Sequence, residues 1–248
     1  MRPVAIITGA SRGIGRATAM LAARQGYDVC INYKEDRVSA EVVAADCEKS
    51  GARAIVCRAD IASRDDVSAL FNHCDDVLGR VSLLVNNAGI IGQASRLEDI
   101  TQNALNETFA VNLFGSVYCA QQAIARMSTN KGGSGGVIIN LSSIAAVTGS
   151  PNEYVHYAAS KAAIETLTIG LAKEVGPEGI RVNAVRAGTT DTEIHARTGN
   201  PDRPALVART APLRRVATPE DIAHAIMWLG SDQAGFASGA ILSISGGL

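Results

Sequence analysis

One tyrosine and one lysine of this 248-residue chain have the spacing of a general acid–base pair. Tyr157 and Lys161 lie four residues apart in the segment YAASK, on a predicted helix, so both side chains share one helix face. A free tyrosine has a pKa of about 10, and a cation about 4 Å away at an effective dielectric near 20 contributes up to about 4 kcal/mol, or about three pKa units. Lys161 could thus make Tyr157 useful for proton transfer. Tyr154 has no such partner, because position 158 is alanine.

A glycine-rich turn near the N-terminus has the features of a phosphate-binding loop. The first apolar stretch runs into TGASRGIG, with glycines at 9, 13 and 15, and an amphipathic stretch follows. Such glycines permit a tight turn, let the backbone approach a pyrophosphate and let a helix pack closely on a strand. The helix N-terminus then presents free N–H groups to the phosphates. An ordinary tight turn would also use glycines, but the position between the first strand and the first helix indicates a dinucleotide site.

The residues after the second predicted strand favour NADP(H) over NAD(H). NAD enzymes place an acidic residue about 20 positions after the glycines to bind the ribose hydroxyls. Here that strand ends Asn32-Tyr33-Lys34 and carries no carboxylate at its tip. Arg12 and Lys34 could converge on a 2′-phosphate and each donate a charge-assisted hydrogen bond. The alternative is that both are solvated surface cations, with Lys34 paired to Glu35 or Asp36.

Short apolar, β-branched runs alternate with longer amphipathic stretches along the whole chain. The nearly continuous apolar character of the runs is typical of parallel strands covered on both faces, and the alternation predicts a Rossmann-type, doubly wound α/β fold with seven parallel strands. No linker interrupts the pattern, so we expect a single domain over residues 1–248. The predicted strands are Val4–Thr8, Val29–Tyr33, Ala54–Arg58, Leu83–Asn86, Val137–Leu141, Val182–Arg186 and Ile241–Ile244. The predicted helices are Ile14–Gln25, Ser39–Ser50, Asp65–Leu78, Thr101–Ala110, Asn112–Met127, Tyr154–Val175 and Pro219–Leu229. The stretch 189–213, with mixed polarity and three prolines, is expected to be a substrate lid.

Composition excludes several classes of protein. The net charge is −1, which gives no excess of positive charge for nucleic acid or an anionic membrane surface. The five cysteines have no C-x-x-C spacing, and the four histidines form no metal-binding pair, so we expect buried thiols, no disulfide framework and no metal site. No targeting segment or apolar stretch of membrane-spanning length is present, which predicts a cytoplasmic protein.

Together these motifs resemble the short-chain dehydrogenase/reductase family, and the resemblance runs from Val4 to Gly247. The motifs that carry it, in chain order, are TGASRGIG at 8–15, Asp60-Ile61, Asn86-Asn87-Ala88-Gly89, Val111-Asn112, Ser142-Ser143, Tyr157-x-x-x-Lys161 and Ser245-Gly246-Gly247. Two positions depart from the family's usual pattern. Ala187 stands where the family usually has a proline before Gly188, and Ser245 stands where it often has an acidic residue.

The resemblance implies catalytic roles for four residues. Tyr157 would donate a proton to the carbonyl oxygen in reduction and remove it in oxidation, and Lys161 would hold the nicotinamide ribose and lower the tyrosine pKa. Ser143 would hydrogen-bond the substrate oxygen, with Ser142 as its rival. Asn112 would hold a water that links Lys161 to solvent.

The glycine loop and the resemblance also imply a set of cofactor-binding residues. Asp60 and Ile61 would flank the adenine, and Asn87 to Gly89 would line the cofactor. Asn87 and Asn112 could instead simply satisfy backbone groups in the core. The full set is Gly9, Ser11, Arg12, Gly13, Ile14, Gly15, Tyr33, Lys34, Asp60, Ile61, Asn87, Ala88, Gly89, Tyr157, Lys161, Gly188, Thr190 and Thr192.

The sequence predicts an oxidoreductase that acts on the carbonyl or secondary alcohol of a small polar molecule. The alternatives are a 3-oxoacyl-carrier-protein reductase and, in a different class, a non-catalytic NADP-binding protein. Substrate contacts are expected in residues 90–96, 145–153 and 189–213. The resemblance further implies a homotetramer, for which Phe114, Val117, Ile124, Ile164, Leu167 and Leu171 offer apolar side chains.

Overall fold

Seven parallel strands form one sheet, as the apolar, β-branched runs predict. The computed structural model describes residues 2–193 and 203–248, and within them the strand order is β3-β2-β1-β4-β5-β6-β7. The order reverses between β1 and β4, where the connections switch from one side of the sheet to the other. The strands are β1 (Val4–Ile7), β2 (Asp28–Tyr33), β3 (Ala54–Arg58), β4 (Val81–Asn86), β5 (Gly136–Ser143), β6 (Ile180–Ala187) and β7 (Ile241–Ile244).

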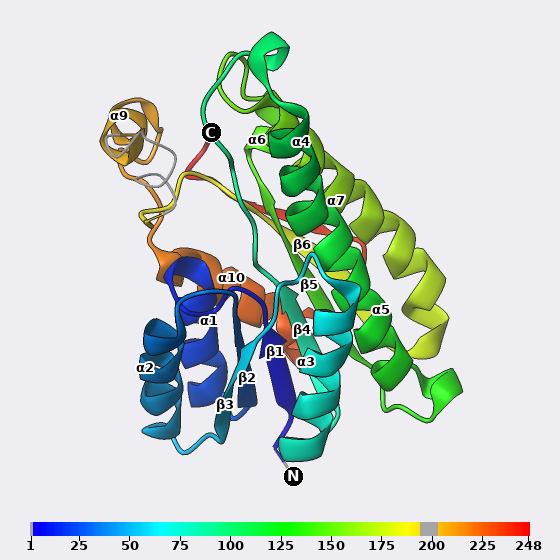
Figure 1. Ribbon diagram of the computed structural model, residues 1–248. Coiled ribbons are helices and arrows are strands. Elements are labelled where there is room, and N and C mark those ends of the chain that lie inside the picture. Colours follow the sequence, from blue (N-terminus) through cyan, green and yellow to red (C-terminus); the bar gives the residue numbers. More distant parts are fainter. Residues whose placement is uncertain (1, 194–202) are drawn as a thin grey trace.

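Helices cover both faces of the sheet (Figure 1). One face packs against α1 (Gly13–Arg24), α2 (Arg37–Glu48) and α10 (Pro219–Gly230), and the other against α3 (Arg64–Val77), α5 (Ser116–Met127) and α7 (Val155–Val175). Each layer has its own apolar core. Ala19, Val43 and Ile226 lie in the first, and Phe71, Cys119 and Val175 lie in the second. The predicted doubly wound α/β fold in a single domain is therefore confirmed.

The predicted break between two helices near Val111 is wrong. Helix α4 (Gln102–Phe109) continues through a π-helical turn, η2 (Ala110–Gly115), directly into α5. A π-turn inserts one extra residue without ending the helix, so the apolar pattern changes phase where the chain stays helical. A short helix, α6 (Ala145–Thr148), is also present between β5 and α7 and was not predicted.

The expected lid, residues 189–213, is described in two parts. Thr189–Glu193 follow β6, and α9 (Arg203–Thr210) follows further along, while residues 194–202 lie outside the described residues. Within the described part of the chain, the helices are too short or too polar to cross a membrane. All five cysteines are buried free thiols, as their spacing predicted.

Candidate active site

A cavity of about 830 Å³ opens at the carboxyl ends of the strands, around the point where the strand order reverses. This is where ligands bind in open parallel α/β sheets. It brings together most of the residues that the sequence singled out. Those that line it are Gly9, Ser11, Arg12, Gly13, Ile14, Tyr33, Lys34, Asp60, Ile61, Asn87, Ala88, Gly89, Ser143, Tyr157, Lys161, Gly188, Thr190 and Thr192.

Close packing explains the glycines of the first loop. Gly9 and Gly13 have φ values of +61° and +53°, which glycine adopts without strain. A Cβ at Gly9 would lie 3.0 Å from Ala88, and one at Gly15 would lie 2.5 Å from the Asn87 Nδ2. Gly15 does not line the cavity but lies behind the loop, where it permits close packing on the end of β4. The backbone of this loop therefore remains accessible to a ligand at the N-terminus of α1.

The Asn87 side chain holds the same loop in place through hydrogen bonds. Its Nδ2 donates to the backbone carbonyl oxygens of Thr8 (2.8 Å) and Gly9 (3.1 Å). From the other side, Asn32 accepts a hydrogen bond from the Gly9 N–H (3.1 Å) and donates to the Ala59 carbonyl oxygen (3.0 Å). These two amides fix the loop to the ends of β4, β2 and β3. The Asn87 side chain thus satisfies backbone groups, which is the alternative that the sequence analysis gave for it.

The two candidate phosphate-binding cations are paired with carboxylates. The Lys34 Nζ lies 2.7 Å from Asp60, and the Arg12 guanidinium lies 3.6 Å from Glu193. The partner of Lys34 is thus Asp60, rather than the sequence neighbours Glu35 or Asp36, because the ends of β2 and β3 are adjacent in the sheet. Both cations still line the cavity. A ligand phosphate at the edge of the cavity would therefore compete with Asp60 and Glu193 for these two cations.

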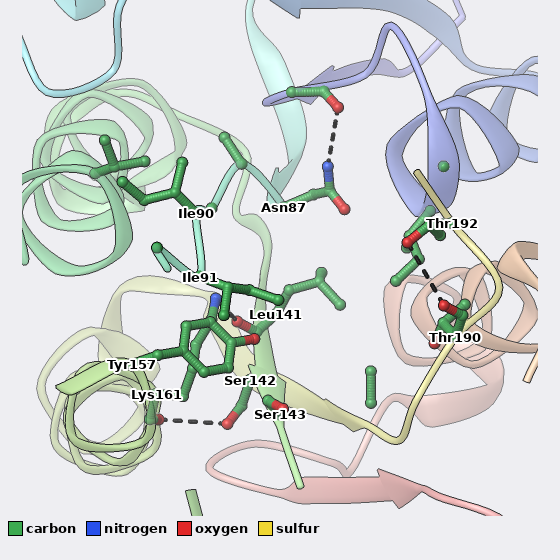
Figure 2. Close-up of a pocket in the computed structure, with 18 of the residues that line it drawn as sticks. Asn87, Ile90, Ile91, Leu141, Ser142, Ser143, Tyr157, Lys161, Thr190 and Thr192 are labelled. Carbon is green, nitrogen blue, oxygen red and sulfur yellow. Dashed lines mark hydrogen bonds between the residues drawn. The ribbon is translucent and has the colours of Figure 1, made fainter. Parts of the chain in front are cut away.

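Tyr157 and Ser143 point into the same space from α7 and the end of β5 (Figure 2). The Ser143 hydroxyl is hydrogen-bonded to the phenol, and both residues line the cavity. Ser142, the rival candidate, also borders the cavity, but its Oγ turns to α7, where it donates to the Lys161 carbonyl oxygen (3.3 Å) and to Glu165 (2.7 Å). The hydroxyl that faces Tyr157 is therefore that of Ser143.

Burial sets the protonation of the tyrosine and the lysine. The Lys161 Nζ donates to the Leu141 carbonyl oxygen (2.8 Å) and lies 5.8 Å from the centroid of the Tyr157 ring. Burial lowers the pKa of Lys161 to about 8. Burial also raises the pKa of Tyr157, and the hydrogen bond from Ser143 offsets only part of this increase. In this structure the Lys161 ammonium is directed to Leu141, and the expectation that it lowers the pKa of Tyr157 stays a prediction.

Asn112 lies behind the cavity wall rather than in it. Its Nδ2 donates to the Ile90 carbonyl oxygen (2.9 Å) and the Ser160 Oγ (3.0 Å), and its Oδ1 accepts from the Ile90 N–H (2.8 Å). The residue is fully buried, in the π-turn η2. A Cβ on Gly89 would lie 3.2 Å from the Asn112 Oδ1 and 3.4 Å from the Lys161 Nζ. Asn112 thus satisfies backbone groups and reaches the lysine only across Gly89.

The segment after β6 closes the cavity opposite Tyr157. Thr190 donates to the Gly188 carbonyl oxygen (3.0 Å), and the Thr192 methyl group packs at Gly13. A Cβ on Gly188 would lie 2.7 Å from the Ser245 Cα, so the C-terminal motif packs directly behind this segment. Each of the three expected substrate regions contributes lining residues, among them Gln93, Thr148 and Thr189.

Sequence reasoning missed several groups at the site. Tyr154 is buried and lines the cavity, although no lysine stands four residues after it. The sequence also did not predict the hydrogen bonds of Asn32 to the glycine loop or the ion pair between Glu165 and Arg186. An asparagine in an otherwise apolar strand was the available signal for Asn32. Within the described residues, no group of three or more His, Cys, Asp or Glu side chains is arranged to hold a metal ion.

Comparison with known proteins gives a consistent match over nearly the whole chain. A family model described as enoyl-(acyl carrier protein) reductase matches residues 9–248. The uncharacterized oxidoreductase YgfF of Escherichia coli (strain K12) is 44% identical over 98% of this chain and 99% of its own. The L-rhamnose 1-dehydrogenase (NAD(P)(+)) of Sphingomonas sp. (strain SKA58) is 38% identical over 98% and 94%. The crystal structure of a short chain dehydrogenase from Burkholderia cenocepacia J2315 in complex with NADP has a TM-score of 0.89 at 33% identity and covers 99% of this chain and 97% of that one.

Proposed function

The chain belongs to the short-chain dehydrogenase/reductase family, and we propose that it is an NADP(H)-dependent oxidoreductase that acts on the carbonyl or secondary alcohol of a small polar molecule. The observation that carries the proposal is that Tyr157 and Ser143 face into the same cavity that the glycine loop borders. A relative named as an NAD(P)(+) dehydrogenase and a similar structure determined with NADP support the choice of cofactor.

The residues present fit a dinucleotide. The backbone at Gly9 and Gly13 and the N-terminus of α1 would hold the pyrophosphate. Gly9 packs so closely on Ala88 that a Cβ there would contact it, so the loop carries no side chain at this position. Arg12 and Lys34 would bind the 2′-phosphate by exchanging their carboxylate partners for it. Asp60 and Ile61 would flank the adenine. When bound, NADP(H) supplies or accepts the hydride.

Side chains of the protein would transfer the proton to the carbonyl oxygen of the substrate. Because burial raises its pKa, Tyr157 stays protonated at neutral pH and can donate its proton to a carbonyl oxygen held between its own hydroxyl and Ser143. The Lys161 ammonium would stabilise the phenolate that remains, and it is largely protonated below pH 8. Asn112 would fix the backbone of Ile90, at the base of the substrate wall.

The test of the mechanism is the Tyr157→Phe variant. This change keeps the ring and removes the proton donor, so turnover should fall by several orders of magnitude while NADPH binding stays nearly intact. Turnover is followed as loss of the NADPH absorbance with a panel of carbonyl compounds, and binding as the change in cofactor fluorescence. Substantial residual kcat in the variant would show that another group transfers the proton. If the wild type binds NADPH tightly but turns over no compound, the non-catalytic alternative is favoured.

The substrate class is proposed from the polar groups around the cavity. Gln93, Thr148, Ser150 and Thr189 offer hydrogen-bonding side chains on the substrate side, which suits a hydroxylated ligand such as a sugar. The alternative is a 3-oxoacyl-carrier-protein reductase, and an acidic carrier protein would need a basic surface around the entrance. The kcat/KM for acetoacetyl carrier protein, compared with a panel of sugars and short ketones, decides between them. A thioester preference of several orders of magnitude would overturn the sugar-like assignment.

Assembly and location are also part of the proposal. We propose a homotetramer, in keeping with the resemblance, and a cytoplasmic location.

A further inference from the structure

A half-buried ion pair lies directly beneath the candidate active site. The Arg186 guanidinium donates to both carboxylate oxygens of Glu165, from Nε (2.8 Å) and Nη2 (2.7 Å), and the two side chains are 21% and 13% exposed. The Ser142 Oγ donates to the same carboxylate (2.7 Å). Burial alone would raise the pKa of Glu165, but the hydrogen bonds from Arg186 and Ser142 hold it below its ordinary value, so the carboxylate stays charged.

Each member of this cluster is next to a residue of the site. Ser142 precedes Ser143 on β5, and Arg186 precedes Ala187 on β6, where the wall opposite Tyr157 begins. Ser142 and Arg186 are register partners in the sheet. Glu165 follows Lys161 by one turn of α7. The ion pair and Ser142 therefore join three elements: α7, which carries the proposed proton donor, β5, which carries Ser143, and β6, which leads into the cavity wall opposite Tyr157.

The geometry of the pair restricts how α7 can move. Tyr157, Lys161 and Glu165 are spaced by four residues, so they lie along one face of the helix. A bidentate arginine–carboxylate pair fixes orientation as well as distance, because both groups are planar. A rotation or slide of α7 that displaced Tyr157 from Ser143 would also have to break three hydrogen bonds at Glu165, two from Arg186 and one from Ser142.

We infer that the ion pair between Arg186 and Glu165, with Ser142, positions Tyr157 and Lys161 of α7 against Ser143 of β5 and the segment after β6. Glu165 and Arg186 are positioning residues, since neither is among the residues that line the cavity. The inference rests on the roles proposed above for Tyr157, Lys161 and Ser143.

The competing explanation is that the pair only stabilises the fold, and the two explanations can be separated. Removing one partner of a buried ion pair leaves an unpaired charge and destabilises the protein, whereas replacing both by apolar residues is often neutral for stability. The double variant E165L/R186M should therefore melt near the wild-type temperature even though the restraint on α7 is gone. Its activity then reports positioning alone.

The experiment compares R186M, R186K, E165L/R186M and a control, R126M. Arg126 forms a similarly buried ion pair with Asp75 (2.6 Å), between α5 and α3 and away from the cavity. Because misplacement of reacting groups by about 1 Å can cost about a hundredfold in rate, kcat should fall about ten- to hundredfold in R186M and in E165L/R186M. R186K, which keeps the charge and one hydrogen bond, should recover part of the loss. R126M should lower the melting temperature without lowering kcat.

Two measurements accompany the rates. The NADPH dissociation constant, from cofactor fluorescence, should remain near that of the wild type in all four variants, so that the loss appears in kcat. A crystal structure of E165L/R186M should show the Tyr157 hydroxyl displaced from Ser143 by on the order of 1 Å. Rates are measured with the compound of the sugar and ketone panel that the wild type turns over fastest, and the crystal structure needs no substrate.

The inference is overturned if E165L/R186M retains the wild-type kcat, or if its Tyr157 and Ser143 superpose on those of the wild type. Failure of the proposed mechanism would look different. In that case Tyr157→Phe would keep its turnover, whatever the Arg186 variants do. If Tyr157→Phe is inactive and E165L/R186M is fully active, only the positioning inference fails.

Discussion

Burial, more than any neighbouring charge, shifts the pKa values of Lys161 and Tyr157. It lowers the pKa of Lys161 to about 8 and raises that of Tyr157. Below pH 8 the folded protein therefore holds an ammonium ion in a site that disfavours it. The difference from the ordinary lysine pKa of 10.5 corresponds to a cost of up to about 3 kcal/mol. This cost is fully present below pH 8, and it disappears as the pH rises from about 8 towards 10.5, where the unfolded chain also loses its proton.

The variant Lys161→Met should therefore be inactive and more stable at pH 7. Its gain in melting temperature over the wild type should shrink between pH 7 and pH 9.5, because the wild-type lysine becomes neutral over that range. Thermal unfolding followed by circular dichroism measures both quantities. Lys173→Met, on the exposed side of the same helix, is the matched control and should show no such pH-dependent gain. A melting temperature for Lys161→Met below that of the wild type at pH 7 would contradict the burial cost.

The paired cations at the edge of the cavity lead to a prediction about cofactor choice. Replacing both Arg12 and Lys34 by alanine should weaken NADPH binding about ten- to hundredfold for each lost contact and leave NADH binding nearly unchanged. Because Lys34 and Arg12 must first give up their carboxylate partners, Asp60 and Glu193, to bind the phosphate, we expect the loss of NADPH affinity to lie near the lower end of this range. Fluorescence titration with each cofactor is the measurement. Arg37→Ala, an exposed cation that pairs with Glu41 and does not line the cavity, is the control. Equal losses for NADPH and NADH would refute the assignment.

At the scale of elements, the position of the glycine loop depends on its close packing against the end of β4. Gly15→Ala would place a Cβ 2.5 Å from the Asn87 Nδ2 and 2.6 Å from the Gly9 carbonyl oxygen. We expect this change to displace the loop and to reduce NADPH affinity and melting temperature together. Gly170→Ala, on α7, is the control, because no atom lies within 4 Å of the added Cβ. It should stabilise the protein by up to about 1 kcal/mol, as alanine does in a helix interior. Unchanged cofactor affinity in Gly15→Ala would show that the loop tolerates the shift.

The elements also show what local sequence can and cannot predict. All seven strands were predictable because each is a short apolar run, and the glycine loop because its residues are contiguous. The partner of Lys34 was not predictable, since Asp60 is brought to it only by the pairing of β2 with β3. The same holds for Glu165 and Arg186, which are 21 residues apart and meet through the packing of α7 on β6. The helix break predicted at Val111 failed because a π-turn changes the phase of the pattern without ending the helix.

At the scale of the whole molecule, the exposure of the apolar side chains decides which of them could form the interfaces of the proposed tetramer. Ile164 and Leu171 are buried in the subunit itself, so they are not available for an interface. Phe114, at the π-turn between α4 and α5, is 49% exposed and is the better candidate. We expect a tetramer mass by light scattering at micromolar concentration, and a smaller species for Phe114→Asp. Val38→Asp, an exposed apolar position on α2, is the control and should leave the mass unchanged. A monomer mass for the wild type would refute the tetramer.

The buried thiols give the chain internal probes of its own breathing motions. Cys47, on α2, lies in one core layer, whereas Cys30, Cys57, Cys74 and Cys119 lie in the opposite layer, which α3 and α5 cover. A thiol with no more than 6% of its surface exposed reacts with an alkylating reagent only when its surroundings transiently open. The labelling rate of Cys47 therefore reports the opening of one side of the sheet, and those of the other four report the opening of the other side. Mass spectrometry of time-resolved alkylation, resolved by peptide, would thus show which layer of the native protein a bound dinucleotide makes more rigid, without any engineered label.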